Sequence, residues 1–316
     1  MDYMSANFHT LAPGVTIIER GWLNCNQIVL QSRQSNVLID SGYGKHAEAT
    51  LGHVAAALGG ATLHWLINTH CHSDHMGGNR AVREKYHCRV TIPEGEVKHV
   101  VPWTEQSCWA EEMDQYAEEF AFDDTIVAGE TFEAGGLRWQ AHAAPGHDMD
   151  ALMYFAADPR ILITGDALWE RGMGFVWPEG LNAAGPNMHI RAAQQALDAI
   201  DTLAPAIVVP GHGAPFTDVT RSLTDARGKL DALERNPARN ARHVAKSLFV
   251  FALLDKGEMQ VGDVPAYLES VPVYRRLRKE FLSGSNDELA ARMLDELVVA
   301  GALRLADGVV RPTMRA

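Results

Sequence analysis

One short segment of the chain holds four side chains of the kinds that bind metal ions. It spans residues 69–75 and follows directly after residues 65–67, an apolar run typical of a strand. Its potential ligands are His70, His72, Asp74 and His75. Imidazole and carboxylate groups suit zinc, iron, manganese or nickel. In an extended backbone, the first three would point to one side and His75 to the other. Since one ion is not expected to use all four, the segment predicts a two-metal site.

Three more potential ligands occur later in the chain, and each follows a short apolar run that is typical of a buried strand. The runs and their ligands are residues 137–144 with His147, residues 161–163 with Asp166, and residues 207–209 with His212. Together with residues 65–67, these runs predict four strands, each followed by a loop that carries potential ligands. A rigid sheet beneath such loops is a common way to hold side chains in a fixed geometry.

The other histidines have no potential ligand beside them in sequence. We interpret them as surface or core residues rather than metal ligands: His9, His46, His53, His64, His87, His99, His142, His189 and His243. A motif counts as a site only when its context supports it. The metal site is therefore assigned to the seven residues of the four strand ends.

The order of these seven residues resembles the metallo-β-lactamase-fold hydrolase superfamily. That superfamily has an H-x-H-x-D-H loop followed by a further histidine, a bridging aspartate and a final histidine, and the resemblance covers about residues 14–215. It implies an α+β fold, the αββα sandwich, with the metal ions at one edge between two facing sheets. It also implies the ligand sets: His70, His72 and His147 for one metal ion, Asp74, His75 and His212 for the second, and Asp166 as the bridge.

Within the superfamily, the residues argue against the commonest zinc β-lactamases, which carry cysteine at the position of Asp166. Cys71 lies between two ligands at a variable position, so we interpret it as a small, partly buried spacer, with a redox or ligand role as the alternative. The pattern resembles the dinuclear branches that include glyoxalase II, ribonuclease Z and the lactonases.

Hydrolysis is the chemistry expected of such a site. Two divalent ions, zinc first and iron or manganese as alternatives, would share a hydroxide that attacks an electrophilic carbonyl or phosphorus. Asp74 is expected to act in catalysis, as a ligand that also accepts the proton of the nucleophile. The sequence contains no G-x-S-x-G motif, so it gives no support to a serine nucleophile.

Composition limits the partners of the protein. The chain of 316 residues has a formal net charge of −12, which disfavours a dedicated nucleic-acid binder. It has no apolar run long enough to span a membrane, and residues 1–7 have no features of a secretion signal. Its four cysteines form no paired framework. These features predict a cytoplasmic protein that acts on a small molecule away from membranes.

The chain is expected to divide into residues 1–224, the metal-binding domain, and residues 225–316, a smaller, mostly helical domain. Its expected elements are helices over residues 242–254, 261–268 and 273–281, a helix that begins with a capping box at residues 285–288, and a hairpin about residues 307–308. This order resembles a winged helix. We expect it to cover the metal cleft or to make a homodimer contact, rather than to bind nucleic acid through the basic residues 275–279.

The loop after Asp166 supplies candidates for substrate binding. Trp169, Phe175 and Trp177 could form an apolar wall, or they could equally pack against the C-terminal helices. Residues 93–123 are interpreted as a peripheral flap, with a helical insertion over the site as the alternative. The expected substrate is an ester, thioester or lactone of a mainly apolar small molecule. The alternatives are a phosphodiesterase or ribonuclease with the same site and, from another class, a metal-dependent sulfur dioxygenase.

Overall fold

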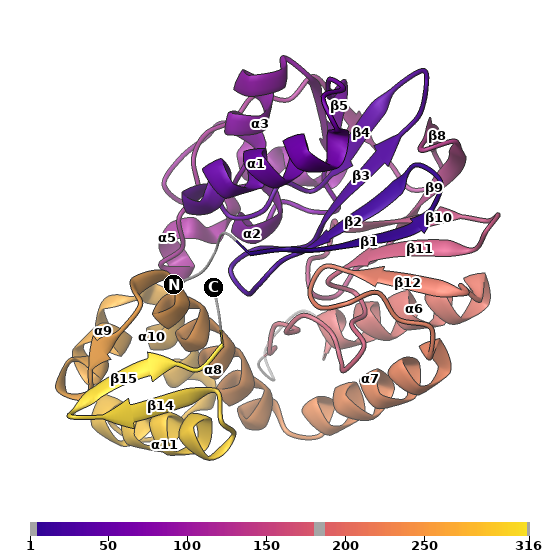
Figure 1. The fold of residues 1–316 in the computed structure, drawn as a ribbon. Helices are drawn as coiled ribbons and strands as arrows, with labels where there is room; N and C mark the ends of the chain where they lie inside the picture. Colours follow the sequence, from indigo (N-terminus) through magenta and orange to yellow (C-terminus); the bar gives the residue numbers. More distant parts are fainter. Residues whose placement is uncertain (1–4, 180–186, 315–316) are drawn as a thin grey trace.

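Two β-sheets packed face to face form the centre of this computed structural model, which describes residues 5–179 and 187–314 (Figure 1). In this described part of the chain, the first sheet has seven strands and the second has five. In spatial order, the first sheet contains β1 (Asn7–Ala12), β2 (Val15–Glu19), β3 (Gln27–Gln31), β4 (Asn36–Ile39), β5 (Trp65–Ile67), β6 (Arg89–Pro93) and β7 (Asp124–Ile126). The second contains β12 (Ile207–Pro210), β11 (Ile161–Gly165), β10 (Leu152–Ala156), β9 (Leu137–Ala143) and β8 (Thr131–Ala134).

Both faces of each sheet are covered, so the side chains of the central strands are buried whichever face they point to. In β10, Leu152, Tyr154 and Ala156 pack into the core between the two sheets, whereas Met153 and Phe155 pack against helices on the other side. Burial on both faces explains why these strands are continuous apolar runs rather than alternating ones.

Helices cover the two outer faces of the sheets (Figure 1). α1 (Ala47–Leu58) and α3 (Asn79–Tyr86) pack on the first sheet, and α6 (Met188–Leu203) and α7 (Val219–Glu234) pack on the second. α1 ends at Gly59, whose left-handed conformation closes the helix. This arrangement confirms the expected αββα sandwich and the α+β class.

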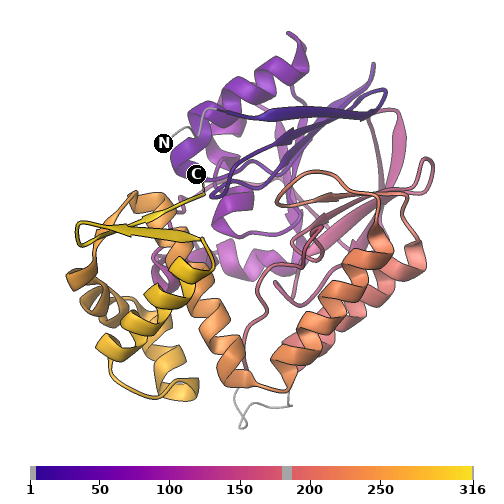
Figure 2. The same cartoon turned by 60° about the horizontal axis from the view of Figure 1, so that its bottom comes forward.

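A mostly helical unit follows the sandwich, as expected. It contains α8 (Pro237–Lys256), α9 (Val264–Ser270), α10 (Pro272–Phe281), α11 (Asn286–Val299) and a small sheet of β13 (Met259–Gln260), β15 (Val309–Pro312) and β14 (Leu303–Ala306). Ser285 and Glu288 form the predicted capping box of α11. α7 and α8, both orange, meet at a sharp angle, so the C-terminal unit stands beside the sandwich (Figure 2). The likeness to a winged helix stays a prediction.

The expected boundary at residue 225 falls inside α7. Leu223 and Leu230 of this helix share a core with α6 and the second sheet, whereas Ala241 of α8 belongs to the core of the C-terminal unit. α8 also begins earlier than expected, because Asn236 caps its first turn through a hydrogen bond from the Arg239 backbone NH. We therefore propose that the two units divide between α7 and α8.

Residues 93–123 fold into short helical pieces rather than one helix. They include α4 (Val97–Val100) and α5 (Ala110–Met113).

Across the described residues, none of the helices combines the length and the apolarity that a membrane crossing requires. Part of the segment in which no secretion signal is expected, residues 1–4, lies outside the described residues.

Candidate metal centre

The seven predicted ligands meet at one edge of the sandwich. β4 runs parallel to β5, and β11 runs parallel to β12, so the carboxyl ends of these neighbouring strands lie at the same edge. The segment after β5 carries His70 and His72, and short α2 (Ser73–Met76) carries Asp74 and His75. The loops after β9, β11 and β12 carry His147, Asp166 and His212. The two sheets thus contribute ligands to the same place.

Hydrogen bonds between the sheets fix the position of these loops. Across the core, the Tyr154 hydroxyl donates to the Asn68 carbonyl at 2.7 Å, and the Leu152 backbone NH donates to the Thr69 carbonyl at 2.8 Å. The Asn26 side chain donates to the carbonyl of Pro210 at 2.9 Å and to that of Gly213 at 2.7 Å. The loops of His70 and His212 are therefore each tied to the opposite sheet.

The first ligand group contains three histidines. The ligand atoms of His70, His72 and His147 all lie within 4.8 Å of one another, and His72 Nδ1 is 2.9 Å from His147 Nε2. His147 Nδ1 is 2.6 Å from the Phe175 carbonyl, to which it donates, so Nε2 faces the group with its lone pair. Burial lowers the pKa of His70 well below its usual value and the pKa values of His72 and His147 to about 4. Neutral imidazoles are the form that binds a metal ion.

The second group contains Asp74, His75, Asp166 and His212, again within 4.8 Å of one another. His212 Nε2 lies 3.0 Å from Asp74 Oδ2. Asp166 faces both groups, since its Oδ1 lies 3.3 Å from His75 Nε2 and its Oδ2 lies 3.4 Å from His147 Nε2. This is the position that a bridging carboxylate would need.

The donor atoms fit a pair of divalent metal ions. His70 Nε2 and His75 Nε2 are buried and, among the described residues, have no hydrogen-bond partner. A buried nitrogen without a partner is costly, and a metal ion would satisfy each of these two atoms. Three imidazoles in one group, and two imidazoles with carboxylates in the other, are donor sets typical of zinc and related ions.

The backbone of the ligand segment differs from the extended one considered above. It is extended only as far as His72, and residues from Ser73 onward turn into α2. The turn moves Asp74 away from the side shared by His70 and His72 and places it with His75. The helical turn therefore separates the two groups, a detail that a purely extended segment would not give.

Asp40 is a residue of this site that the sequence analysis did not identify. Its Oδ2 lies 2.9 Å from His75 Nδ1 and accepts a hydrogen bond from the Thr69 hydroxyl at 2.8 Å, and its Oδ1 accepts one from the Thr69 backbone NH at 2.8 Å. A carboxylate behind a histidine fixes the ring and directs its other nitrogen toward the metal. Asp40 directly follows the buried strand β4. An acidic residue in that position is the feature of the sequence that could have identified it. Cys25 also lies within reach of His75 and Asp40, but burial raises the pKa of its thiol to about 11.

Two buried carboxyl groups lie behind the first ligand group. Asp148 Oδ2 is 3.6 Å from His72 Nε2, and Glu96 Oε1 accepts a hydrogen bond from the Cys71 backbone NH at 3.1 Å. Burial, followed by the charge of Asp148, raises the pKa of Glu96 well above its usual value. Cys71 itself is fully buried, and burial raises the pKa of its thiol well above the usual value, which fits the interpretation as a spacer.

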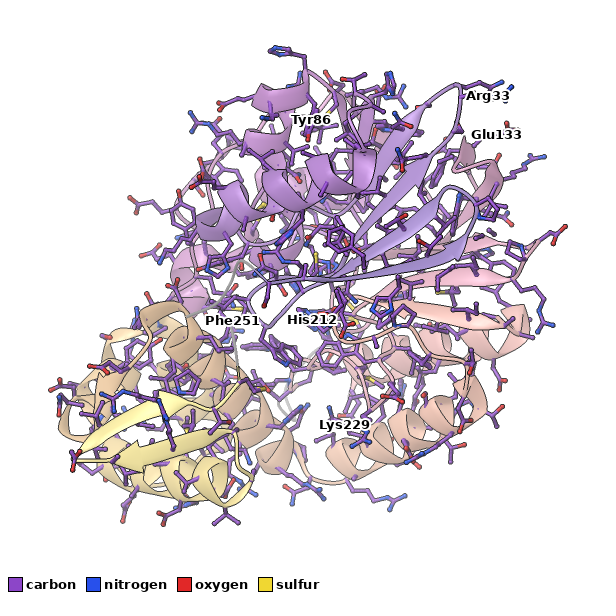
Figure 3. The ribbon with its side chains drawn as sticks, viewed as in Figure 1. Arg33, Tyr86, Glu133, His212, Lys229 and Phe251 are labelled. Carbon is purple, nitrogen blue, oxygen red and sulfur yellow. The ribbon has the colours of Figure 1, made fainter. Side chains whose placement is uncertain are left out.

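A cavity of about 350 Å³ opens from the metal centre toward the C-terminal unit. Of the three aromatic candidates, Trp169 and Phe175 line it and Trp177 does not, and Phe175 also packs against the C-terminal core, so both alternatives that the sequence left open occur. Trp177 instead packs against the C-terminal core, with the Arg276 guanidinium 4.1 Å from its ring centre. The cavity is bounded by the sandwich edge, where Figure 3 labels His212, and by α8, where it labels Phe251.

Trp22 is a second residue that the sequence did not reveal. Its ring stacks on His212, with 4.6 Å between ring centres and 10° between planes, and Trp169 contacts the same histidine edge-on at 5.3 Å. The Trp169 indole also donates to Asp166 Oδ1 at 3.2 Å. These two tryptophans therefore hold part of the second ligand group while they form the cavity wall.

Comparison with known proteins agrees with this geometry. The chain is 31% identical over 112 residues to a protein named hydroxyacylglutathione hydrolase from Rhodopseudomonas palustris and 29% identical over 115 residues to one from Brucella ovis. These matches span 35% and 36% of this chain and 36% and 37% of the relatives, so they cover little more than a third of either protein.

Solved structures share the fold. A metallo-β-lactamase family protein from Thermus thermophilus superposes with a TM-score of 0.56 at 21% identity, over 96% of this chain and 100% of that one. The FEZ-1 metallo-β-lactamase from Legionella gormanii gives a TM-score of 0.58 at 15% identity, over 71% of this chain and 94% of that one. The family model described as the metallo-beta-lactamase superfamily matches residues 20–212. The chain therefore belongs to the metallo-β-lactamase superfamily.

Proposed function

We propose that this protein is a dinuclear metal-dependent hydrolase that cleaves an ester, thioester or lactone of a mainly apolar small molecule. The observation that carries the proposal is that Asp166 joins two groups of ligand side chains at the end of an apolar cavity. The relatives named hydroxyacylglutathione hydrolase support a hydrolase of small molecules. All four cysteines are free and buried, which fits the reducing cytoplasm as its location.

In this proposal His70, His72 and His147 would hold one ion, Asp74, His75 and His212 would hold the other, and Asp166 would be shared by both. Zinc is the first expectation because of the imidazole-rich donor set, with iron or manganese as alternatives. Two such ions would make water acidic enough to supply a nucleophile near neutral pH and would polarise the reacting oxygen of the substrate. Side chains of the protein are proposed to accept the proton and to bind the substrate.

Asp74 is the residue proposed to accept the proton of the attacking water. Burial alone would raise the pKa of Asp74, but without a metal ion the charge of His75 and the hydrogen bond from His212 lower it to about 2. A divalent ion that replaces the His75 proton would favour the carboxylate form in the same way. The carboxylate is therefore ionised at neutral pH, the form that can accept a proton. Asp166 is ionised as well, because the charges of His212 and His75 outweigh its burial and hold its pKa well below the usual value.

The walls of the cavity favour an apolar acyl group. Trp22, Trp169, Met173 and Phe175 line it near the metal centre, and Leu248, Phe251, Leu254 and Leu297 line it from the C-terminal unit. Burying apolar surface contributes about 25 cal/mol per Å². A volume of about 350 Å³ suits a small molecule rather than a structured RNA.

The three arginines in the basic run of α10 have partners within the protein. Arg275 donates to the carbonyls of Glu269 and Ser270, Arg276 contacts Glu112 at 3.3 Å, and Arg278 contacts Glu269 at 3.0 Å. These arginines offer little free charge to a phosphate backbone. Together with the net charge of −12, they favour a small-molecule substrate over nucleic acid.

The ligand assignment predicts that Asp166→Asn and His72→Ala each lower kcat by more than about 100-fold. Substituting a residue that only supports a metal ligand already lowers metal affinity or activity by about 10–100-fold, and these two residues are ligands themselves. Cys71→Ala should keep most of the activity, since its thiol is a buried spacer. Steady-state kinetics with metal analysis and circular dichroism would measure this. A folded Cys71→Ala variant as inactive as His72→Ala would contradict the assignment.

The role of Asp40 predicts weaker metal binding in Asp40→Asn. Without the carboxylate behind His75, the ring loses its fixed orientation, and the affinity for at least one ion should fall about 10–100-fold. Competition with a chelator of known affinity would measure the change. Asp295→Asn, an exposed carboxylate of α11, is the matched control. Unchanged affinity in Asp40→Asn would show that Asp40 does not position the ligand.

The apolar cavity predicts that esters, thioesters or lactones with apolar acyl groups are cleaved far faster than RNA. Each added methylene that enters the cavity should raise kcat/KM by roughly fourfold, or about 0.8 kcal/mol, until the space is filled. Steady-state kinetics on an acyl-length series and on a structured RNA would decide. Faster RNA cleavage that Arg276→Glu and Arg278→Glu abolish would replace this function with a ribonuclease.

A further inference from the structure

The cavity also has a basic wall. Lys229 of α7 and His243, Lys246 and Ser247 of α8 line it, and no carboxylate among the described lining residues lies outside the metal centre. Figure 3 shows Lys229 on α7, well apart from His212 at the edge of the sandwich. Apart from Gln115, the polar lining thus falls into two sets, the acidic and histidine side chains of the metal centre and a separate set of Lys229, His243, Lys246 and Ser247.

The register of α8 explains the order of these side chains. His243, Lys246 and Ser247 occupy positions i, i+3 and i+4, and Val250, Phe251 and Leu254 continue the same face toward the C-terminus of the helix. All six line the cavity. One helix face therefore changes from polar near α7 to apolar where the Phe251 ring packs edge-on against Tyr43 at 5.6 Å.

Lys229 is the member of this wall that most needs a partner. It is half-buried and makes no ion pair with any residue in the described ranges 5–179 and 187–314. Burial lowers its pKa, which shows that the charged ammonium is disfavoured there. An anion beside it would offset that cost, whereas a wholly apolar ligand would increase it.

A second lysine and a histidine lie on the same wall as Lys229. Lys246 contacts Glu296 Oε2 at 2.7 Å, but the glutamate does not line the cavity and leaves part of the lysine facing it. Burial, and after it the charges of Lys229, Lys246 and Arg239, lower the pKa of His243 to about 3. His243 is then neutral at physiological pH and has an N–H to donate to an acceptor oxygen.

We propose that Lys229, His243 and Lys246 form an anion-binding subsite for the end of the substrate that lies away from its reacting carbonyl. The inference rests on the proposed function and names its substrate class: an ester or thioester with an apolar middle and a terminal carboxylate or phosphate. The metal centre holds the reacting end, the aromatic walls hold the middle, and the lysines hold the anion. A charge-assisted hydrogen bond at that end would add both affinity and orientation.

The test compares substrates that differ only at the far end. p-Nitrophenyl esters of linear acids, in a series of chain lengths, would carry a methyl ester, a carboxylate or a phosphate at the terminus. At the best length, the wild-type protein should prefer an anionic end to the methyl ester by about tenfold or more in kcat/KM. The comparison of carboxylate with phosphate identifies which anion the subsite accepts.

The variants test which residues create the preference. Lys229→Met and Lys246→Met keep much of the apolar stem but remove the charge, so each should reduce the ratio between anionic and neutral substrates to less than about threefold. Arg221→Gln removes an exposed charge from the same helix as Lys229, at a site 70% exposed, and should leave the ratio unchanged. Because the readout is a ratio within one protein sample, partial unfolding of a variant does not imitate the effect.

A binding experiment separates this subsite from the proposed function. Trp22 and Trp169 line the cavity, so their fluorescence should report binding of a linear dicarboxylate and of its monomethyl ester. The dicarboxylate should bind about tenfold more tightly, and Lys229→Met should remove the difference. Ester hydrolysis with no preference for an anionic end would overturn the subsite and leave the hydrolase. Lysine-dependent dicarboxylate binding without hydrolysis of any ester would support the subsite and overturn the hydrolase.

Discussion

The metal centre depends on the packing of two sheets through one continuous apolar core. His70, His72, Asp74 and His75 come from the first sheet, and His147, Asp166 and His212 come from the second. Neither sheet alone carries a complete set. The apolar core fixes the distance between the sheets, and cross-sheet hydrogen bonds from Asn26 and Tyr154 fix the two ligand loops at their common edge. Such a core is rigid, so small shifts of the loops are resisted.

The C-terminal unit and residues 93–123 complete the cavity together. Asp114 accepts a hydrogen bond from the Tyr267 hydroxyl at 3.0 Å and contacts Lys256 at 2.9 Å. In the same segment, Gln115 accepts from Ser73 in the ligand helix at 2.8 Å and lines the cavity. Residues 93–123 therefore connect the metal centre with the C-terminal helices. This contact gives the segment, interpreted from sequence only as a flap, a structural role in closing the site.

Local patterns explain why much of the site was predictable. Ligands such as His70 and Asp166 directly follow apolar runs, and strand ends in parallel neighbours meet at one edge. The predicted αββα fold is confirmed, and the seven side chains do come together. The capping box at Ser285 was readable because its spacing is local.

Residues that the sequence analysis missed act through tertiary contacts. Asp40 and Trp22 lie far from His75 and His212 in sequence and meet them only through folding. His243 has no ligand beside it in sequence, yet it lines the cavity because α8 packs against α7 and the sandwich edge. For Trp177 the sequence left two positions open, a cavity wall or a contact with the C-terminal helices, because its place beside Arg276 depends on α10, about a hundred residues later.

The central claim is that the seven side chains bind two metal ions that share Asp166. The most direct measurement is an anomalous difference map from crystals of the metal-loaded protein, with data from both sides of the metal absorption edge. The account predicts two peaks in each chain, one bonded by His70, His72 and His147 and the other by Asp74, His75 and His212, with Asp166 between them. A single peak, or a peak bonded by the sulfur of Cys25 or Cys71, would contradict it.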